Sequence, residues 1–286
     1  MICYGFTMSS VCCKSRVVVA CALLVSCAGP TRSSPVQPIS SAASASALPS
    51  PVAPPPPSAS AALPAADGRQ EEPAWCDPAG FAAREFPVQA PGVQRLHAFK
   101  IGGVTLVGLA VGYSPLDGVR AVAKQLSSAG PDVGYCTWYY NVNSPEAAKV
   151  FLHHPVVPNP IDLSPETASE LFAKIAGPNF DQDPVSMITC AERFGYVALG
   201  CDAQKHRGPS AFAMLLAFSG CTPEHAAEIA NRLWGLNRVP PEVRLAIART
   251  GFELGNQRPA SRKRLQASFS RSSVSPAAAA SVSPAP

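Results

Sequence analysis

A long Ser/Ala/Pro-rich segment limits where this 286-residue chain can fold. From Ala28 to about Glu72 most residues are Ser, Ala or Pro, and prolines 54–57 lie at its centre. The segment has no apolar periodicity, so it cannot bury enough surface to offset the entropy lost on ordering. This composition predicts an extended linker over residues 27–72 with polyproline II character. The folded core is therefore expected over residues 73–258, which is long enough for one domain.

The C-terminal end of the chain is predicted to be a disordered tail over residues 259–286. It carries a cluster of basic residues around Arg264 and then becomes rich in Ser, Ala and Pro. A basic run in such a biased segment is typical of a solvated tail. The net charge of +4, of which Lys14 and Arg16 contribute two, is too small to indicate a nucleic-acid partner.

Capping signals mark the starts of several helices. A Ser or Thr hydroxyl precedes a proline at residues 114–115, 144–145, 164–165 and 222–223. The hydroxyl can accept a hydrogen bond from the first turn, and proline suits the first helical position. The pattern predicts helices over about 115–128, 145–152, 165–176 and 223–235, with another from Pro240 onwards.

Apolar, aromatic or β-branched runs bounded by Gly, Pro, Asn or Asp indicate strands. They lie at about 96–101, 104–111, 135–141, 185–190, 194–200 and 212–219. Gly102 and Gly103 between the first two predict a tight hairpin turn. Together these elements predict an α+β fold with one mixed or antiparallel sheet and helices packed on one face. A strand, a glycine and a capped helix follow one another at 107–115 and again at 215–223, which suggests two β-β-α pseudo-repeats.

The N-terminal segment has the layout of an export signal. Lys14 and Arg16 precede an apolar run over 17–25 that is too short to span a bilayer as a helix, and Leu24-Val25-Ser26-Cys27 closes it. The pattern resembles the lipobox signal peptide of bacterial lipoproteins; the alternative is an ordinary secretory peptide. The resemblance implies that residues 1–26 are removed and that Cys27 is thioether-linked to diacylglycerol, with an acyl chain such as palmitate on its amine. Ala28, rather than Asp, implies the outer membrane, or the outer face of the plasma membrane in a cell without one.

Five cysteines remain in the predicted domain, and in an oxidising compartment they are expected to pair. Cys190 and Cys201 flank a short segment and would face each other across a turn near Arg193, so we expect them to form a disulfide. The next candidate pair is Cys76 with Cys136. Cys221 is then left over.

Two groups of residues are candidates for a functional site. Cys221 lies just before a predicted helix whose dipole would favour a thiolate, and His225 follows one turn later. The pair could act as nucleophile and base, and the alternative is a structural cysteine. Trp138 and Tyr140 lie on one face of a predicted strand and could stack on a sugar or a protein partner. The alternative is that they pack in the core.

Motifs for metal, nucleotide or hydrolase chemistry are absent from the sequence. It contains no C-x-x-C, H-E-x-x-H, G-x-S-x-G, Walker or dinucleotide-binding pattern, so we expect no metal and no cofactor. The expected function is that of a lipid-anchored cell-envelope protein, a binding or scaffolding module. It would contact the membrane through its anchor and an envelope protein or cell-wall component through its domain. The alternative is an envelope hydrolase or transferase with Cys221 as nucleophile and a nearby His.

Overall fold

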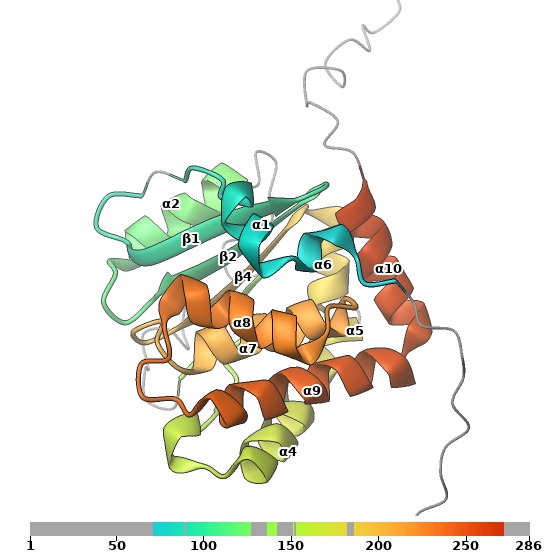
Figure 1. Ribbon diagram of the computed structural model, residues 1–286. Helices are drawn as coiled ribbons and strands as arrows, with labels where there is room; N and C mark the ends of the chain where they lie inside the picture. The colour runs from blue at the N-terminus through green and yellow to red at the C-terminus, as the bar shows by residue number, and fades with distance from the viewer. Residues whose placement is uncertain are drawn as a thin grey trace, which may run out of the picture. The chain divides into compact units, whose positions relative to one another are not determined.

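A mixed four-stranded sheet organises the domain (Figure 1). The computed structural model describes residues 71–88, 90–126, 136–141, 151, 153–181 and 186–271. The strands are β1 (Gln94–Ile101), β2 (Val104–Ala110), β3 (Thr137–Tyr140) and β4 (Tyr196–Cys201), in the order β1-β2-β4-β3. β1 is antiparallel to β2, whereas β2, β4 and β3 run parallel. The α+β class and the single mixed sheet are as predicted.

The β1–β2 hairpin turns where the two glycines predicted it. Ile101 pairs with Val104, and Gly102 between them has a φ of 55°. This left-handed conformation favours glycine. A Cβ atom on Gly102 would also overlap the Phe269 carbonyl, so the turn lies tightly against the C-terminal part of the domain.

Among the described residues, the helices predicted near Pro115, Pro165, Pro223 and Pro240 are present, and the structure adds others. Ser164 Oγ accepts from Thr167 N at 3.2 Å, and Thr222 Oγ1 accepts from His225 N at 3.3 Å. In the described ranges, no helix is both long enough and apolar enough to cross a bilayer. The helices are α1 (Pro78–Phe81), α2 (Leu116–Leu126), α4 (Pro165–Ala176), α5 (Pro178–Asp181), α6 (Met187–Arg193), α7 (Arg207–Phe218), α8 (Pro223–Trp234), α9 (Pro241–Gln257) and α10 (Pro259–Ser270), with short 3-10 turns at Ala74–Cys76, Ala82–Arg84 and Pro160–Asp162.

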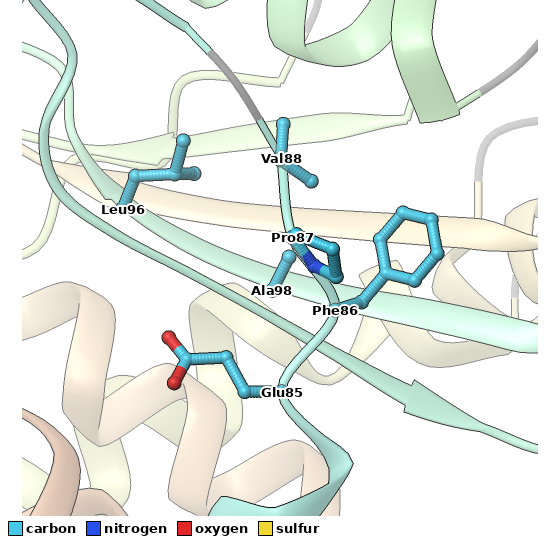
Figure 2. Close-up of a pocket in the computed structure, with 6 residues that line it drawn as sticks. All are labelled: Glu85, Phe86, Pro87, Val88, Leu96 and Ala98. Carbon is cyan, nitrogen blue, oxygen red and sulfur yellow. The ribbon is translucent and has the colours of Figure 1, made fainter.

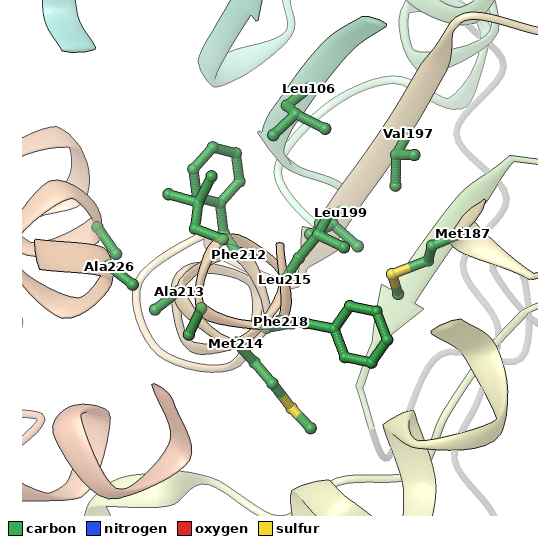
Figure 3. Packing of buried hydrophobic residues seen from close by; sticks show 14 of the residues in the cluster. Leu106, Met187, Val197, Leu199, Phe212, Ala213, Met214, Leu215, Phe218 and Ala226 are labelled. Carbon is green, nitrogen blue, oxygen red and sulfur yellow. The ribbon is translucent and has the colours of Figure 1, made fainter. Parts of the chain in front are cut away.

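Helices cover both faces of the sheet, so the prediction of helices on one face only is wrong. On one face α7 is buried from Gly208 to Phe218 and packs against β4, α8 and α9. Its apolar side chains meet those of β2 and β4, as Figure 3 shows for Phe212, Leu215, Leu106 and Leu199. On the other face, α2 packs against the side chains of β2 and β3. The two faces therefore have separate apolar clusters.

Two of the predicted strands are helices. Residues 212–219 belong mainly to α7, and residues 187–190 belong to α6. α7 is apolar on all sides because it is buried on all sides, and such a run cannot be distinguished from a buried strand by periodicity. α6 begins at Ser186, whose hydroxyl accepts from Thr189 N at 3.0 Å. Since residues 215–218 are helical, the predicted second β-β-α unit does not exist, and the pseudo-repeat is wrong.

The prediction of a disordered tail from residue 259 is wrong up to residue 270. This segment forms α10, which buries Leu265 and Phe269. Arg262 is also buried, and its guanidinium donates to the carbonyls of Phe218 at 3.0 Å and Phe252 at 2.7 Å. The domain therefore includes α10. The predicted signal peptide, most of the linker, most of the helix predicted over 145–152 and residues 272–286 lie outside the described residues.

Candidate functional site

The cysteines of the domain pair differently from the prediction. Cys76 is bonded to Cys221 and Cys136 to Cys190, with S–S distances of 2.07 and 2.10 Å, and Cys201 is a buried free thiol. The predicted pairs Cys190–Cys201 and Cys76–Cys136 are both wrong. Cys190 lies in α6, before β4, and Cys201 is the last residue of β4. A six-residue strand spans about 20 Å, which is too far for a disulfide.

The Cys221 nucleophile predicted from the sequence is also wrong, because Cys221 has no free thiol. His225 instead places Nδ1 2.9 Å from Glu72 Oε2, and Glu72 Oε1 accepts from Thr222 N at 2.6 Å. Glu72 thus satisfies a backbone donor at the start of α8, where the helix dipole favours an anion. Glu72, Cys76 and Cys221 bring a carboxylate oxygen and two sulfur atoms within 4.8 Å of one another, but the disulfide leaves no thiolate to bind a metal.

The predicted solvent-facing aromatic row does not exist. Trp138 and Tyr140 are both fully buried, and burial raises the pKa of the Tyr140 hydroxyl. Trp138 stacks on His153, with ring centroids 4.7 Å apart, and Tyr140 faces Phe172 of α4. β3 is the last strand of the sheet, and its outer edge is covered at Trp138, which forms a parallel bridge with His153. The alternative, that these aromatic residues pack in the core, is correct.

A polar network lies at the carboxyl ends of the parallel strands. Arg207 Nη1 donates to Asn141 Oδ1 at 2.9 Å, and Asn141 Nδ2 donates to the Tyr139 hydroxyl at 2.7 Å. That hydroxyl lies 3.4 Å from Asp202 Oδ1, and His154 stacks on the Tyr139 ring. Ligands commonly bind at this edge of a sheet. The sequence contains a signal for this network that the predicted sites do not include: Asn141 ends one predicted strand, and Asp202 lies just beyond the end of another.

Burial and close packing affect two side chains of this network, His154 and Asp202. Desolvation lowers the pKa of His154, so its imidazole is neutral at pH 7. Asp202 lies directly against Gly112, where any side chain would overlap the carboxylate. The network therefore brings a neutral imidazole close to the side chains of Tyr139 and Asp202, but none of its members is a Ser or Cys nucleophile.

A buried arginine braces the loop between β4 and α7. Arg244 is fully buried, and its guanidinium donates to the carbonyls of Lys205 at 3.2 Å and Gly235 at 3.1 Å, and to Asn231 Oδ1. Burial lowers its pKa to about 10, so the group stays charged at neutral pH. It holds the loop over residues 202–206, which carries Asp202 and leads to Arg207 at the start of α7.

A groove of about 400 Å³ lies beside β1 (Figure 2). Its residues come from the segment before β1 and from β1 itself, and we call it the β1 groove. Phe86 N donates to the Ala98 carbonyl at 2.6 Å, which fixes one wall against the strand. The groove is lined by Glu85, Phe86, Pro87, Val88, Leu96 and Ala98.

Comparison of the chain with protein-family models, with curated proteins and with solved structures finds no match.

Proposed function

We propose that this chain is a lipid-anchored cell-envelope protein whose domain acts as a binding or scaffolding module. The observation that carries the proposal is the segment from Lys14 to Cys27, with its basic flank, short apolar run and Leu-Val-Ser-Cys ending. Lipid on Cys27 and its amine would give stable anchoring, because two or more acyl chains hold a protein where one does not. With Ala28 next to the anchor, we propose the outer membrane, or the outer face of the plasma membrane where no outer membrane exists.

The cysteines of the domain support export. Four of the five are paired in disulfides, and such bonds persist in oxidising compartments and are rare in the cytosol. The same pairing favours binding over catalysis, because Cys221 was the nucleophile of the enzymatic alternative.

Lipidation can be tested with a matched pair of variants. Cells of the native host expressing Cys27→Ala or Cys21→Ala are grown with labelled palmitate. We expect Cys27→Ala to lose the label, because it removes the only sulfur that the signal peptidase pathway would modify. Cys21→Ala makes the same change within the apolar run and should keep the label and stay in the membrane fraction. Equal labelling of the Cys27→Ala variant and the unaltered protein would refute the anchor.

A further inference from the structure

We propose that the carboxyl ends of the parallel strands bind a free α-amino acid with an apolar side chain. We call this place the carboxyl-edge site and define it by the charged residues Asp202 and Arg207 and by the exposed apolar residues Tyr113, Val156 and Leu236. The proposal names the ligand class of the binding function proposed above and rests on that function.

The site lies where two neighbouring parallel strands lead to helices on opposite faces of the sheet. β2 is followed by α2 on one face, and β4, which pairs with β2, is followed by α7 on the other. The pairing ends at Gly112 and Asp202, where Gly112 N donates to the Asp202 carbonyl at 2.9 Å. Ligands of open sheets with parallel strands commonly bind at such a point, because the two loops separate there.

Two opposite charges at this edge have no ionic partner within the described parts of the chain. Asp202 and Arg207 are both partly exposed, and no ion pair joins them. A chain of neutral groups links them instead. Asp202 Oδ1 lies 3.4 Å from the Tyr139 hydroxyl, which accepts from Asn141 Nδ2 at 2.7 Å, and Asn141 Oδ1 accepts from Arg207 Nη1 at 2.9 Å. The carboxylate and the guanidinium are therefore held apart at the two ends of one network.

One edge of the Arg207 guanidinium is suited to a carboxylate. Nη1 donates to Asn141 and to the Val157 carbonyl at 3.4 Å, on one side of the group. Nε is buried and has no acceptor among the described residues, which is a costly state for a donor. A carboxylate can accept from Nε and the neighbouring Nη2 together, in the bidentate geometry that arginine and carboxylate groups commonly adopt. A ligand carboxylate would thus satisfy the buried donor.

The Asp202 carboxylate is suited to the ammonium group of the same ligand. It lies against the Gly112 backbone, where a Cβ atom would overlap Oδ1, and its contact with the Tyr139 hydroxyl is long for a hydrogen bond between oxygens. An ammonium group would supply charge-assisted hydrogen bonds. With one hydrogen bond at each end, an α-amino acid spans about 8 Å between a carboxylate and a guanidinium. This span is too long for a direct ion pair and within the reach of the three contacts that link Asp202 to Arg207. An inorganic anion, in contrast, would leave Asp202 without a partner.

Exposed apolar side chains lie in the loops around these two charges. They are Tyr113, Val156 and Leu236, which are 60%, 54% and 41% exposed. Each is next in sequence to a residue whose backbone bonds to Asp202, Arg207 or His206. They are three of the four large apolar side chains that are exposed in the described residues, so such side chains are concentrated at this edge. Apolar side chains gathered around polar groups are typical of a binding site, and they favour a ligand with an apolar side chain of its own.

Isothermal titration calorimetry of the full lipidated protein in detergent measures the binding of L-leucine, L-valine and L-phenylalanine. The amino acid that binds most tightly is then compared with its amide, which has no carboxylate, and with the carboxylic acid that lacks its amine. We expect each analogue to bind at least about tenfold more weakly, because each loses one charge-assisted contact. Glycine should also bind at least about tenfold more weakly, because it has no apolar side chain to bury.

Two variants assign the two ends of the ligand. Asp202→Asn keeps the shape of the side chain and removes its charge, so it should weaken binding of the amino acid about tenfold and leave binding of the carboxylic acid unchanged. Arg207→Lys keeps the charge and loses the bidentate edge, so it should weaken binding of the amino acid and the carboxylic acid and leave the amide unchanged. Asp162→Asn and Arg249→Lys make the same changes at exposed positions and should leave all three affinities unaltered.

The comparison of ligands uses the unaltered protein, so its result does not depend on how a variant folds. Dissociation constants above about 10 mM for all three amino acids would overturn the proposal, and so would equal affinity for the amino acid and either analogue. An equal loss of affinity in the control variants would overturn it as well. Calorimetry in detergent does not depend on the anchor. Palmitate labelling of Cys27 without amino-acid binding would therefore overturn this inference alone, whereas amino-acid binding by an unlabelled protein would overturn the anchor alone.

Discussion

Removing the Cys76–Cys221 disulfide should destabilise the domain more than any other cysteine change. The bond joins residues 145 positions apart, whereas Cys136–Cys190 joins residues 54 apart. If the main effect of each bond is to limit the entropy of the unfolded chain, they contribute about 5 and about 4 kcal/mol respectively. The Cys76→Ala, Cys221→Ala double variant should therefore lose about 5 kcal/mol of unfolding free energy, with little change in the native contacts around it.

The measurement is guanidinium unfolding of the non-reduced protein, followed by far-UV circular dichroism. The slope of the free energy with denaturant should rise in the double variant, because its unfolded state is less compact. Cys201→Ala is the control, since it removes a buried thiol but leaves both disulfides, and should cost about 1 kcal/mol. A loss below about 2 kcal/mol in the double variant, or peptide mapping that links Cys76 to Cys136, would refute this reasoning.

Two further predictions concern the hairpin turn and the last helix. Gly102→Ala should lower the free energy of unfolding by about 2–3 kcal/mol, because a Cβ there meets the Phe269 carbonyl and the backbone is left-handed. Gly103→Ala should lower it by less than about 1 kcal/mol. Thermal unfolding of the two variants measures the difference, and equal midpoints would contradict the prediction. A chain that stops after Arg258 loses α10, and its free energy of unfolding should fall by about 3–6 kcal/mol, which is what burial of two apolar side chains contributes. A chain that stops after Arg271 keeps α10, and its free energy of unfolding should stay within about 0.5 kcal/mol of that of the full protein. Equal stability of the two truncations would mean that α10 does not contribute to the core.

Features set by local interactions were predictable from the sequence. The starts of α4 and α8 follow from Ser164 and Thr222, because a capping hydroxyl bonds to a backbone donor only three residues away. The β1–β2 turn follows from Gly102 in the same way, since its left-handed backbone is a property of the residue itself. The four strands of the sheet were also found, since their apolar runs are bounded by turn residues.

Features that depend on distant contacts were decided by the tertiary structure. The sequence predicts a strand over 212–219 because a fully buried helix and a fully buried strand have the same continuous apolar pattern. The packing of α7 against α8, α9 and β4 distinguishes the two. The sequence predicts a tail from residue 259 because its basic residues are visible there, whereas the carbonyl groups of Phe218 and Phe252 that bind Arg262 come close to it only in the folded chain. The predicted functional sites are wrong for the same reason. The sequence shows that Cys221 precedes a helix, but the docking of residues 72–76 on that helix, which turns the thiol into a disulfide, exists only in the folded chain.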